Sequence, residues 1–308
     1  MTNRGLLVKN NGSSYLVERL SDGELFVCKI KGRFRISGIK TTNPLSVGDI
    51  VDFELGDGDD DSVICNILPR RNYIVRRSTN LSKEAHIIAS NLDNVFLVVS
   101  LCSPSTSYEF VDRFLVTCEL YHVPVTILLN KIDLCEEQEM DAFMSVYEKA
   151  GYRVLQCSAT ENIGIDKIKG MMNGKISLFS GNSGVGKSTI INNISPNIDI
   201  KMGEVSDHHS KGKHTTTFSQ MFKIDNDTYL IDTPGVKGFG LIDVEKEEIA
   251  RYFPDLFKVS RGCRFNNCTH THEPGCAVVE AVKEDVISLE RYESYLKILE
   301  DDEKDKYR

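Results

Sequence analysis

A glycine-rich segment near the middle of the chain follows an apolar run and has the pattern Gly-x4-Gly-Lys-Ser, from Gly181 to Ser188. Its glycines allow the backbone to curl so that successive N–H groups point at phosphate oxygens, at the positive end of the helix that follows. Lys187 would reach the β- and γ-phosphates, and the Ser188 hydroxyl would take one position on Mg²⁺. The pattern therefore predicts a phosphate-binding loop rather than a turn that only ends a strand. The expected nucleotide contacts come from Gly181, Asn182, Ser183, Gly184, Val185, Gly186, Lys187, Ser188 and Thr189.

Two loops that precede this segment have the composition expected for recognition of a guanine base. They contain Asn130, Lys131, Ile132 and Asp133 in the first loop, and Ser158, Ala159 and Thr160 in the second. Each follows a strand-like apolar run, at the strand end where open α/β sheets bind ligands. The Asp133 carboxylate can accept hydrogen bonds from the N1–H and the 2-amino group of guanine, a pair of donors that adenine lacks. Backbone N–H groups of the second loop would contact the guanine oxygen, although each motif alone also fits an ordinary polar loop.

The residues expected to complete the catalytic site follow the phosphate loop. Asp232 ends an apolar run and can hold Mg²⁺ through a water, while the Gly235 N–H can contact the γ-phosphate. Thr216 is the expected threonine ligand of Mg²⁺, with Thr215 as the alternative. Many GTPases place a water-orienting glutamine directly after this glycine, whereas this chain has Val236. Intrinsic hydrolysis should therefore be slow unless a nearby histidine or a bound partner orients the water.

Together these five elements predict a GTPase, and their order predicts a circular permutation. The guanine-recognition loops usually follow the phosphate loop, but here they precede it. The natural break falls after Gly235, so the strand at residues 94–101 begins the domain. The nucleotide site need not change, because it depends on where the loops lie in space.

The elements around these loops predict an α/β domain with a largely parallel sheet. Apolar runs predict strands at residues 94–101, 125–129, 153–157, 176–180 and 228–231. Helical periodicity predicts helices at residues 109–121, 137–150, 165–172 and 188–193.

The first part of the chain predicts a small β-barrel of the oligonucleotide-binding type. Its five short strands are expected at residues 4–9, 14–19, 24–30, 49–55 and 62–68. Basic residues gather around the third strand and the loop after it, namely Lys29, Lys31, Arg33, Arg35 and Lys40, with Phe34 among them. They could contact RNA through cations and one stacking ring, or they could form an ordinary solvated face.

Three cysteines and a histidine near the end of the chain have the spacing Cys-x4-Cys-x-His-x5-Cys, formed by Cys263, Cys268, His270 and Cys276. This ligand set suits a tetrahedral structural Zn²⁺ with no open position for catalysis. His272 is a competing ligand that spacing alone does not exclude. Helices are expected after the cluster at residues 277–286 and 289–299.

Composition limits the class of protein. Charged residues make up 27% of the chain and hydrophobic residues 41%, as in ordinary globular proteins, and the net charge is −8. The only net basic part is residues 1–80, with 12 basic against 10 acidic residues. Without an apolar run of membrane-spanning length or a signal-like beginning, we expect a cytoplasmic protein with no membrane partner. We expect three domains, at residues 1–72, 73–240 and 241–308.

The combination of a five-strand barrel, a permuted GTPase and this zinc spacing resembles the bacterial circularly permuted GTPases that depend on the small ribosomal subunit. The sequences GNSGVGKST, NKID and DTPG carry the resemblance, which covers essentially the whole chain. It implies GTP hydrolysis stimulated by the small ribosomal subunit, a role in late maturation of that subunit, and contacts of barrel and zinc domain with ribosomal RNA. It also implies GTP/GDP, Mg²⁺ and one structural Zn²⁺ as ligands, and we expect a monomer. The alternatives are a permuted GTPase of large-subunit assembly and an RNA-binding protein with a structural nucleotide site.

Overall fold

The computed structural model describes residues 2–30, 44–56, 61–77, 85–196, 220–232 and 244–306. The first five strands form a closed barrel, as predicted from their spacing. They are β1 (Thr2–Asn10), β2 (Tyr15–Arg19), β3 (Leu25–Ile30), β4 (Ile50–Glu54) and β5 (Ser62–Ile67). They pair in the order β1-β2-β3-β5-β4, and β4 closes on β1. Val17, Val51 and Phe53 are completely buried inside, as expected for small barrels, in which inward-facing and outward-facing residues alternate along each strand.

The central sheet brings together strands that are far apart in the sequence. They are β8 (Asn94–Val99), β9 (Val125–Leu129), β10 (Arg153–Gln156), β11 (Ile176–Ser180), β12 (Gln220–Asp225) and β13 (Thr228–Asp232). Their order is β10-β9-β8-β11-β13-β12, and every pair is parallel except β12 with β13. The strand that carries the phosphate loop, β11, thus lies between β8 and β13 although it follows β8, β9 and β10 in the chain. This arrangement confirms the permuted GTPase fold.

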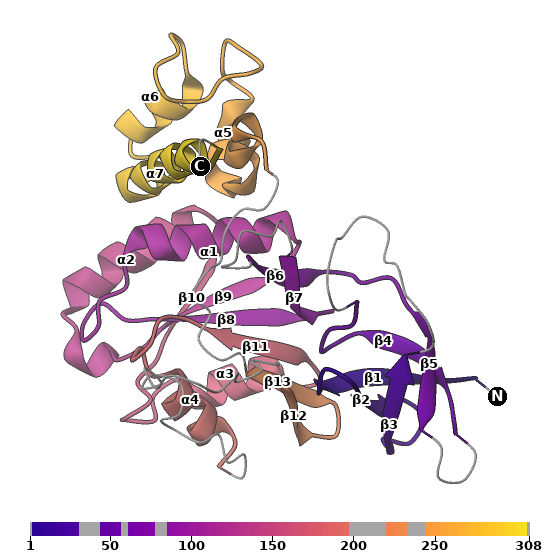
Figure 1. The fold of residues 1–308 in the computed structure, drawn as a ribbon. Helices are drawn as coiled ribbons and strands as arrows, with labels where there is room; N and C mark the ends of the chain where they lie inside the picture. Colours follow the sequence, from indigo (N-terminus) through magenta and orange to yellow (C-terminus); the bar gives the residue numbers. More distant parts are fainter. Residues whose placement is uncertain are drawn as a thin grey trace, which may run out of the picture.

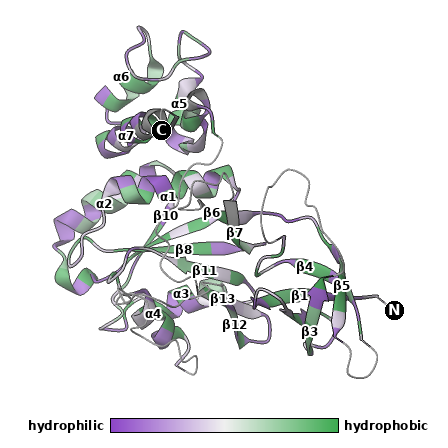
Figure 2. Ribbon diagram, in the orientation of Figure 1, coloured by the Kyte–Doolittle hydropathy of each residue, from purple (hydrophilic) through white to green (hydrophobic). Residues whose placement is uncertain are grey.

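Helices cover both faces of this sheet (Figure 1). One face packs against α1 (Tyr108–Leu120) and α2 (Glu137–Lys149), and the other against α3 (Ile165–Met172) and α4 (Lys187–Ile194). All six residues of β8 are buried, because its alternate side chains enter two different hydrophobic clusters. Figure 2 shows hydrophobic residues along the strands and alternating character along α1 and α2, which each present one side to the sheet.

Three features of the fold were not predicted. Strands β6 (Tyr73–Arg77) and β7 (Ala85–Ser90) form a separate two-stranded sheet in a segment for which the sequence predicted no element. Strand β12 adds an antiparallel edge to the central sheet, and Lys9 of β1 pairs with Gln220 of β12. The barrel and the central sheet therefore form one continuous hydrogen-bonded sheet.

The last part of the chain is helical and lies over α1 (Figure 1). It contains η2 (Lys246–Tyr252), α5 (Pro254–Ser260), α6 (Ala277–Lys283) and α7 (Leu289–Lys306). Helix α6 was predicted to end at residue 286, three residues beyond its observed end. Helix α7 was predicted to end at residue 299, whereas it continues to Lys306. Within the described part of the chain, no helix combines the length and apolar character needed to cross a membrane.

Candidate nucleotide and metal sites

The predicted nucleotide loops converge at one edge of the central sheet. The loops after β9, β10 and β11 all leave the carboxyl ends of parallel strands in the run β10-β9-β8-β11, where α/β sheets bind ligands. The loops predicted to recognise guanine and phosphate therefore lie at the same end of the sheet.

The phosphate loop has a backbone that only glycine accommodates at two positions. Gly181 and Gly186 have φ angles of 143° and 100°. A Cβ at Gly181 would lie 2.2 Å from the Val98 carbonyl oxygen, and one at Gly186 would lie 2.3 Å from Asn130 Nδ2. These distances are far below van der Waals contact, so a side chain at either position would displace the loop.

Lys187 begins α4 and folds back over the loop. Its Nζ donates to the carbonyl oxygens of Gly181 at 2.8 Å and Asn182 at 2.6 Å. The ammonium group therefore lies against the loop, beside the positive end of α4. Both charges favour an anion at this position.

Asn130 joins all three loops. Its Nδ2 donates to the Val185 carbonyl oxygen at 2.8 Å in the phosphate loop, and its Oδ1 accepts from the Ala159 N–H at 3.0 Å in the second guanine loop. The side chain is only 1% exposed. Since a buried amide of this kind satisfies groups on both sides, it sets the spacing between the base-recognition and phosphate-binding parts of the site.

Asp133 is exposed and held by hydroxyl groups. Its carboxylate accepts from Ser158 Oγ at 2.5 Å and Thr160 Oγ1 at 3.4 Å. The Ser158 hydrogen bond is the main reason that the pKa of Asp133 lies below its ordinary value. The carboxylate is therefore ionised at neutral pH and can accept hydrogen bonds from a base.

Asn193 supports the second guanine loop and was not predicted. It lies on α4, and its Nδ2 donates to the Ala159 carbonyl oxygen at 2.6 Å. Ala159 thus receives one hydrogen bond from Asn193 and gives one to Asn130. No motif in the sequence marks Asn193, because this contact exists only after α4 has packed near the loop that follows β10.

Asp232 is described through its backbone alone. It ends β13 and pairs in register with Phe179 of β11, one residue before the end of that strand. The predicted Mg²⁺-binding position therefore lies at the same sheet edge as the phosphate loop. Several predicted residues lie outside the described ranges: Thr215, Thr216, Gly235, Val236, Lys31, Arg33, Phe34, Arg35 and Lys40.

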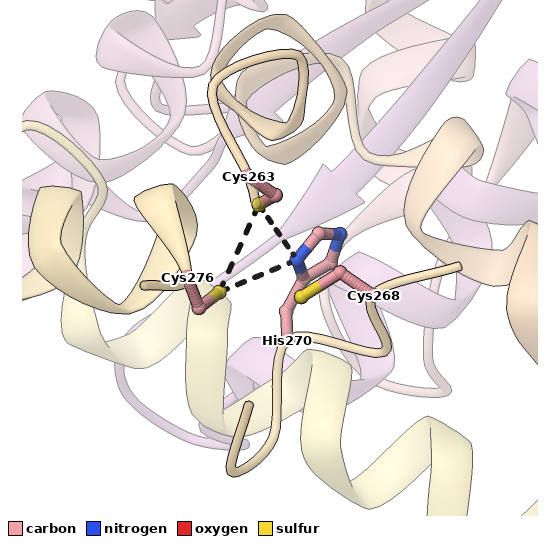
Figure 3. Close-up of side chains that lie close together, drawn as sticks. All are labelled: Cys263, Cys268, His270 and Cys276. Atoms are coloured by element: carbon pink, nitrogen blue, oxygen red, sulfur yellow. Dashed lines mark hydrogen bonds between the residues drawn. The ribbon is translucent and has the colours of Figure 1, made fainter. Parts of the chain in front are cut away.

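The predicted metal ligands form a compact cluster in the C-terminal part of the chain (Figure 3). The ligand atoms of Cys263, Cys268, His270 and Cys276 all lie within 4.8 Å of one another. His270 Nδ1 is 3.6 Å from Cys263 Sγ and 3.5 Å from Cys276 Sγ, and these two sulfurs are 3.9 Å apart. A tetrahedral Zn²⁺ with Zn–S near 2.3 Å and Zn–N near 2.0 Å requires separations of roughly 3.5–3.8 Å. The donor set and its spacing therefore fit Zn²⁺.

The structure distinguishes the two histidines that spacing left open. The His270 ring joins the thiols and is 3% exposed, whereas His272 Nδ1 lies 2.8 Å from Thr271 Oγ1 at the surface. The Tyr292 hydroxyl donates to the His270 carbonyl oxygen at 2.7 Å and fixes the backbone there. Burial lowers the pKa of His270, which favours the neutral imidazole that a metal needs.

Glu273 organises the loop between His270 and Cys276 and was not predicted. Its carboxylate accepts from the backbone N–H groups of Thr269 at 2.7 Å and Thr271 at 3.0 Å. Burial alone would raise the pKa of Glu273, but these hydrogen bonds and one from the Thr269 hydroxyl place it well below the ordinary value. The loop is thus supported by a charge that is not itself in the cluster.

Comparison with known proteins places this architecture in one family. The family model described as RsgA GTPase matches residues 67–242, and the model described as RsgA N-terminal domain matches residues 4–64. The chain belongs to the RsgA GTPase family. This membership confirms the prediction of a GTP-hydrolysing enzyme with an N-terminal barrel.

The RsgA relationship extends over nearly the whole chain. A protein from Bacteroides thetaiotaomicron named small ribosomal subunit biogenesis GTPase RsgA 2 is 54% identical over 308 residues, covering 99% of both chains. A Flavobacterium johnsoniae protein named small ribosomal subunit biogenesis GTPase RsgA is 50% identical and covers 97% of this chain and 93% of its own. Among solved structures, YjeQ from Thermotoga maritima is 33% identical with a TM-score of 0.79, covering 98% of each chain. YloQ, described as a circularly permuted GTPase, is 27% identical with a TM-score of 0.75, covering 98% of this chain and 95% of its own.

Proposed function

We propose that this RsgA-family chain hydrolyses GTP to GDP and phosphate in late maturation of the small ribosomal subunit, and that the subunit stimulates the reaction. The single observation that carries the GTPase part is the buried Asn130 side chain, which joins the phosphate loop to the second guanine loop. The ribosomal part rests on relatives named small ribosomal subunit biogenesis GTPase, at up to 54% identity over 99% of the chain among those compared.

The proposed roles of the nucleotide-binding residues follow from their positions. Asn130 and Asp133, with the Ser158–Ala159 backbone, select guanine, and the loop from Gly181 to Thr189 binds the phosphates. Mg²⁺ would supply charge stabilisation between the phosphates, with Ser188, Thr216 and Asp232 as its protein partners. Gly235 would contact the γ-phosphate through its N–H. The support is the shared sheet edge and the fit of Lys187 to an anion.

The cluster around His270 is proposed to bind one structural Zn²⁺ through its three thiolates and one imidazole. All four protein ligand positions are then filled, so the ion stabilises the fold and takes no part in hydrolysis. The donor set supports this role, as do the separations of 3.6, 3.5 and 3.9 Å among His270 Nδ1, Cys263 Sγ and Cys276 Sγ.

The remaining parts of the proposal concern organisation and partners. The barrel, GTPase and zinc domains are proposed to span residues 1–72, 73–240 and 241–308. The barrel and the zinc domain would contact ribosomal RNA, the protein would act in the cytoplasm, and it would be a monomer. The oligonucleotide-binding topology of the barrel supports the proposed contact between barrel and RNA.

The experiment that tests the proposal is the GTP hydrolysis rate of the purified chain, alone and with purified small or large ribosomal subunits. We expect strong stimulation by the small subunit only. Ser188→Ala should abolish it, because the hydroxyl proposed to bind Mg²⁺ is removed. The matched control Ser145→Ala makes the same change on the exposed face of α2 and should retain the full rate.

Each alternative predicts a different result. Stimulation by the large subunit alone would assign the chain to large-subunit assembly. GTP binding without turnover under all three conditions would make the nucleotide site structural. Either outcome would overturn the proposed function.

A further inference from the structure

Two cysteines lie in contact on neighbouring loops beside the nucleotide site. Cys102 is in the segment that follows β8, and Cys135 directly follows η1 (Ile132–Leu134) after β9. Their Sγ atoms are 2.9 Å apart although the residues are 33 positions apart in the chain. Both side chains are half-buried, so they remain within reach of small solutes. The roles proposed above for the nucleotide site use neither thiol.

Backbone contacts orient the two thiols toward each other. Cys135 Sγ lies 3.3 Å from the Lys131 carbonyl oxygen, and Cys102 Sγ lies 3.4 Å from the Leu134 carbonyl oxygen. The Ser100 hydroxyl donates to the Cys102 carbonyl oxygen at 2.6 Å and supports its loop. Since a disulfide bond is about 2.05 Å long, the sulfurs need to approach by less than about 1 Å. The loops can therefore be joined with little rearrangement.

The pair also lies at a junction between the guanine loop and the phosphate loop. Lys131 Nζ donates to the carbonyl oxygens of Ser103 at 2.5 Å and Gly184 at 2.8 Å. Ser103 adjoins Cys102, and Cys135 follows Asp133 by two residues. A covalent bond between the thiols would therefore fix the loop that contains Asp133 against a segment that Lys131 already links to the phosphate loop.

We propose that Cys102 and Cys135 form a reversible disulfide that restricts the guanine loop and slows release of bound guanine nucleotide. This inference rests on the proposed nucleotide site and adds its regulation. Burial, followed by the hydrogen bond with Cys102, raises the pKa of Cys135 to about 11, so only a small fraction of Cys135 is the reactive thiolate at neutral pH and its exchange reactions are slow. The reduced pair is then a stable dithiol until an oxidant is present.

The oxidant is a small-molecule disulfide such as oxidised glutathione. One protein thiolate attacks a glutathione sulfur, which breaks the glutathione S–S bond, forms a mixed disulfide and releases one glutathione. The second protein thiolate attacks the mixed disulfide at the protein sulfur and releases the second glutathione. The two thiol protons end on the two glutathione thiols, and two electrons pass from the protein to glutathione.

Slower release follows from the position of the crosslink. Nucleotide leaves when the loops that surround it open locally, and such opening requires the guanine loop to move relative to its neighbours. The crosslink removes part of that movement while leaving the Lys131 contacts in place. Coupling between two sites commonly changes a binding constant by about fivefold or more, and we expect the release rate to fall by at least that factor.

The experiment uses the full-length chain treated with oxidised glutathione and then examined by peptide mass mapping and by release of a fluorescent GDP. The variants are Cys102→Ser and Cys135→Ser, and the control is Cys65→Ser, which changes a half-buried cysteine on β5 of the barrel. Mapping separates a Cys102–Cys135 crosslink from any disulfide formed within the metal cluster. We expect the crosslink and slow release in the wild type and in Cys65→Ser, reversal by dithiothreitol, and neither effect in the other two variants.

Two results would overturn the inference. One is oxidation of other thiols to mixed disulfides while Cys102 and Cys135 remain unlinked. The other is a mapped crosslink with an unchanged release rate. If the reduced protein bound no guanine nucleotide, the proposed nucleotide site would fail as well, and the mapping would still decide whether the thiols pair.

Discussion

The central sheet and the C-terminal helical region are stabilised in different ways. In the sheet, all six residues of β8 are buried among apolar side chains from both layers of helices. The C-terminal region surrounds a Cys/His cluster, and it meets the sheet domain through Arg291, a completely buried cation on α7. Arg291 donates to Asp112 of α1 at 2.6 Å and to Asp255 of α5 at 2.7 Å. Apolar burial thus orders the sheet, while the C-terminal region adds a buried ion-pair network and a candidate metal cluster to an apolar cluster of its own around Phe253 and Leu256.

This difference has a consequence for motion between the two regions. If the C-terminal region moved away from α1, Asp112 would lose its cation while Arg291 kept only Asp255, and breaking such a buried pair costs several kcal/mol. Small movements in which the C-terminal region and α1 shift together avoid this cost. The four predictions below separate the two sources of order, from the largest effect to the smallest.

Loss of the metal ligands should have the largest effect and should be confined to the C-terminal region. Structural Zn²⁺ in small domains contributes apparent binding energies of about 10–16 kcal/mol near neutral pH. We expect Cys276→Ser, or treatment with a chelator, to remove hydrogen-exchange protection from residues 254–283 and to leave β8 and β9 protected.

The two neighbouring histidines, His270 and His272, provide a sharper version of the same test. His270→Ala should behave like Cys276→Ser, while His272→Ala should retain protection, because only the His270 ring lies among the thiols. Equal losses in the two variants would show that the ligand assignment is wrong.

Replacement of the buried arginine should have the next largest effect. Arg291→Met leaves Asp112 and Asp255 without their cation and also removes the guanidinium from the Phe253 ring, 4.7 Å away. We expect the free energy of unfolding to fall by about 3–5 kcal/mol, measured by urea denaturation.

The matched control for this substitution is Arg251→Met. Arg251 pairs with Glu248 at 2.8 Å, but its side chain is 60% exposed. An exposed pair contributes little, so this change should stay within about 0.5 kcal/mol. Similar losses in both variants would contradict the special role given to the buried charge.

Asp112 should make the stability of the C-terminal junction depend on pH. Burial raises the pKa of Asp112 from 3.8 to about 6, and Arg291 offsets only part of that effect. The folded state then binds the Asp112 proton more tightly than the unfolded state. Proton binding by Asp112 therefore stabilises the folded state fully below about pH 4, and this stabilisation is lost as the pH rises through 6. The free energy of unfolding should therefore fall by at most about 3 kcal/mol over this pH range.

The variant Asp112→Asn stays neutral and should lack this decline between pH 5 and 7. The measurement is the free energy of unfolding of wild type and variant at pH 5, 6 and 7. Parallel pH profiles of the two proteins would exclude Asp112 as the titrating group.

The smallest expected effect concerns the nucleotide site, where a polar side chain joins loops that the sheet already positions. Asn130→Ala leaves the Val185 carbonyl oxygen and the Ala159 N–H without partners, which should cost about 1–3 kcal/mol of stability. The exposed Gln138→Ala on α2 serves as the control and should cost less than about 0.5 kcal/mol. Urea denaturation checks both, and a loss as large as that of Arg291→Met would break the distinction between the two regions.

Much of the fold was predictable from residues that are close in the chain. The five barrel strands, the strand before the phosphate loop and helices α1 to α4 were expected within a few residues of their observed bounds, because apolar periodicity and turn residues are local signals. The two-stranded sheet of β6 and β7 and the edge strand β12 were missed, since their pairing depends on partners that the surrounding sequence does not reveal.

The sequence by itself determined which chemistry the chain can perform, because motif spacing places the glycines and Lys187 along one loop and the Asp133 carboxylate directly after a strand. Tertiary structure alone decided how those parts meet. Asn130 joins loops 55 positions apart, Cys102 meets Cys135 across 33 positions, and Arg291 reaches Asp112 across 179. Contacts at such separations arise only when whole strands and helices have packed, so no local pattern of residues could have predicted them.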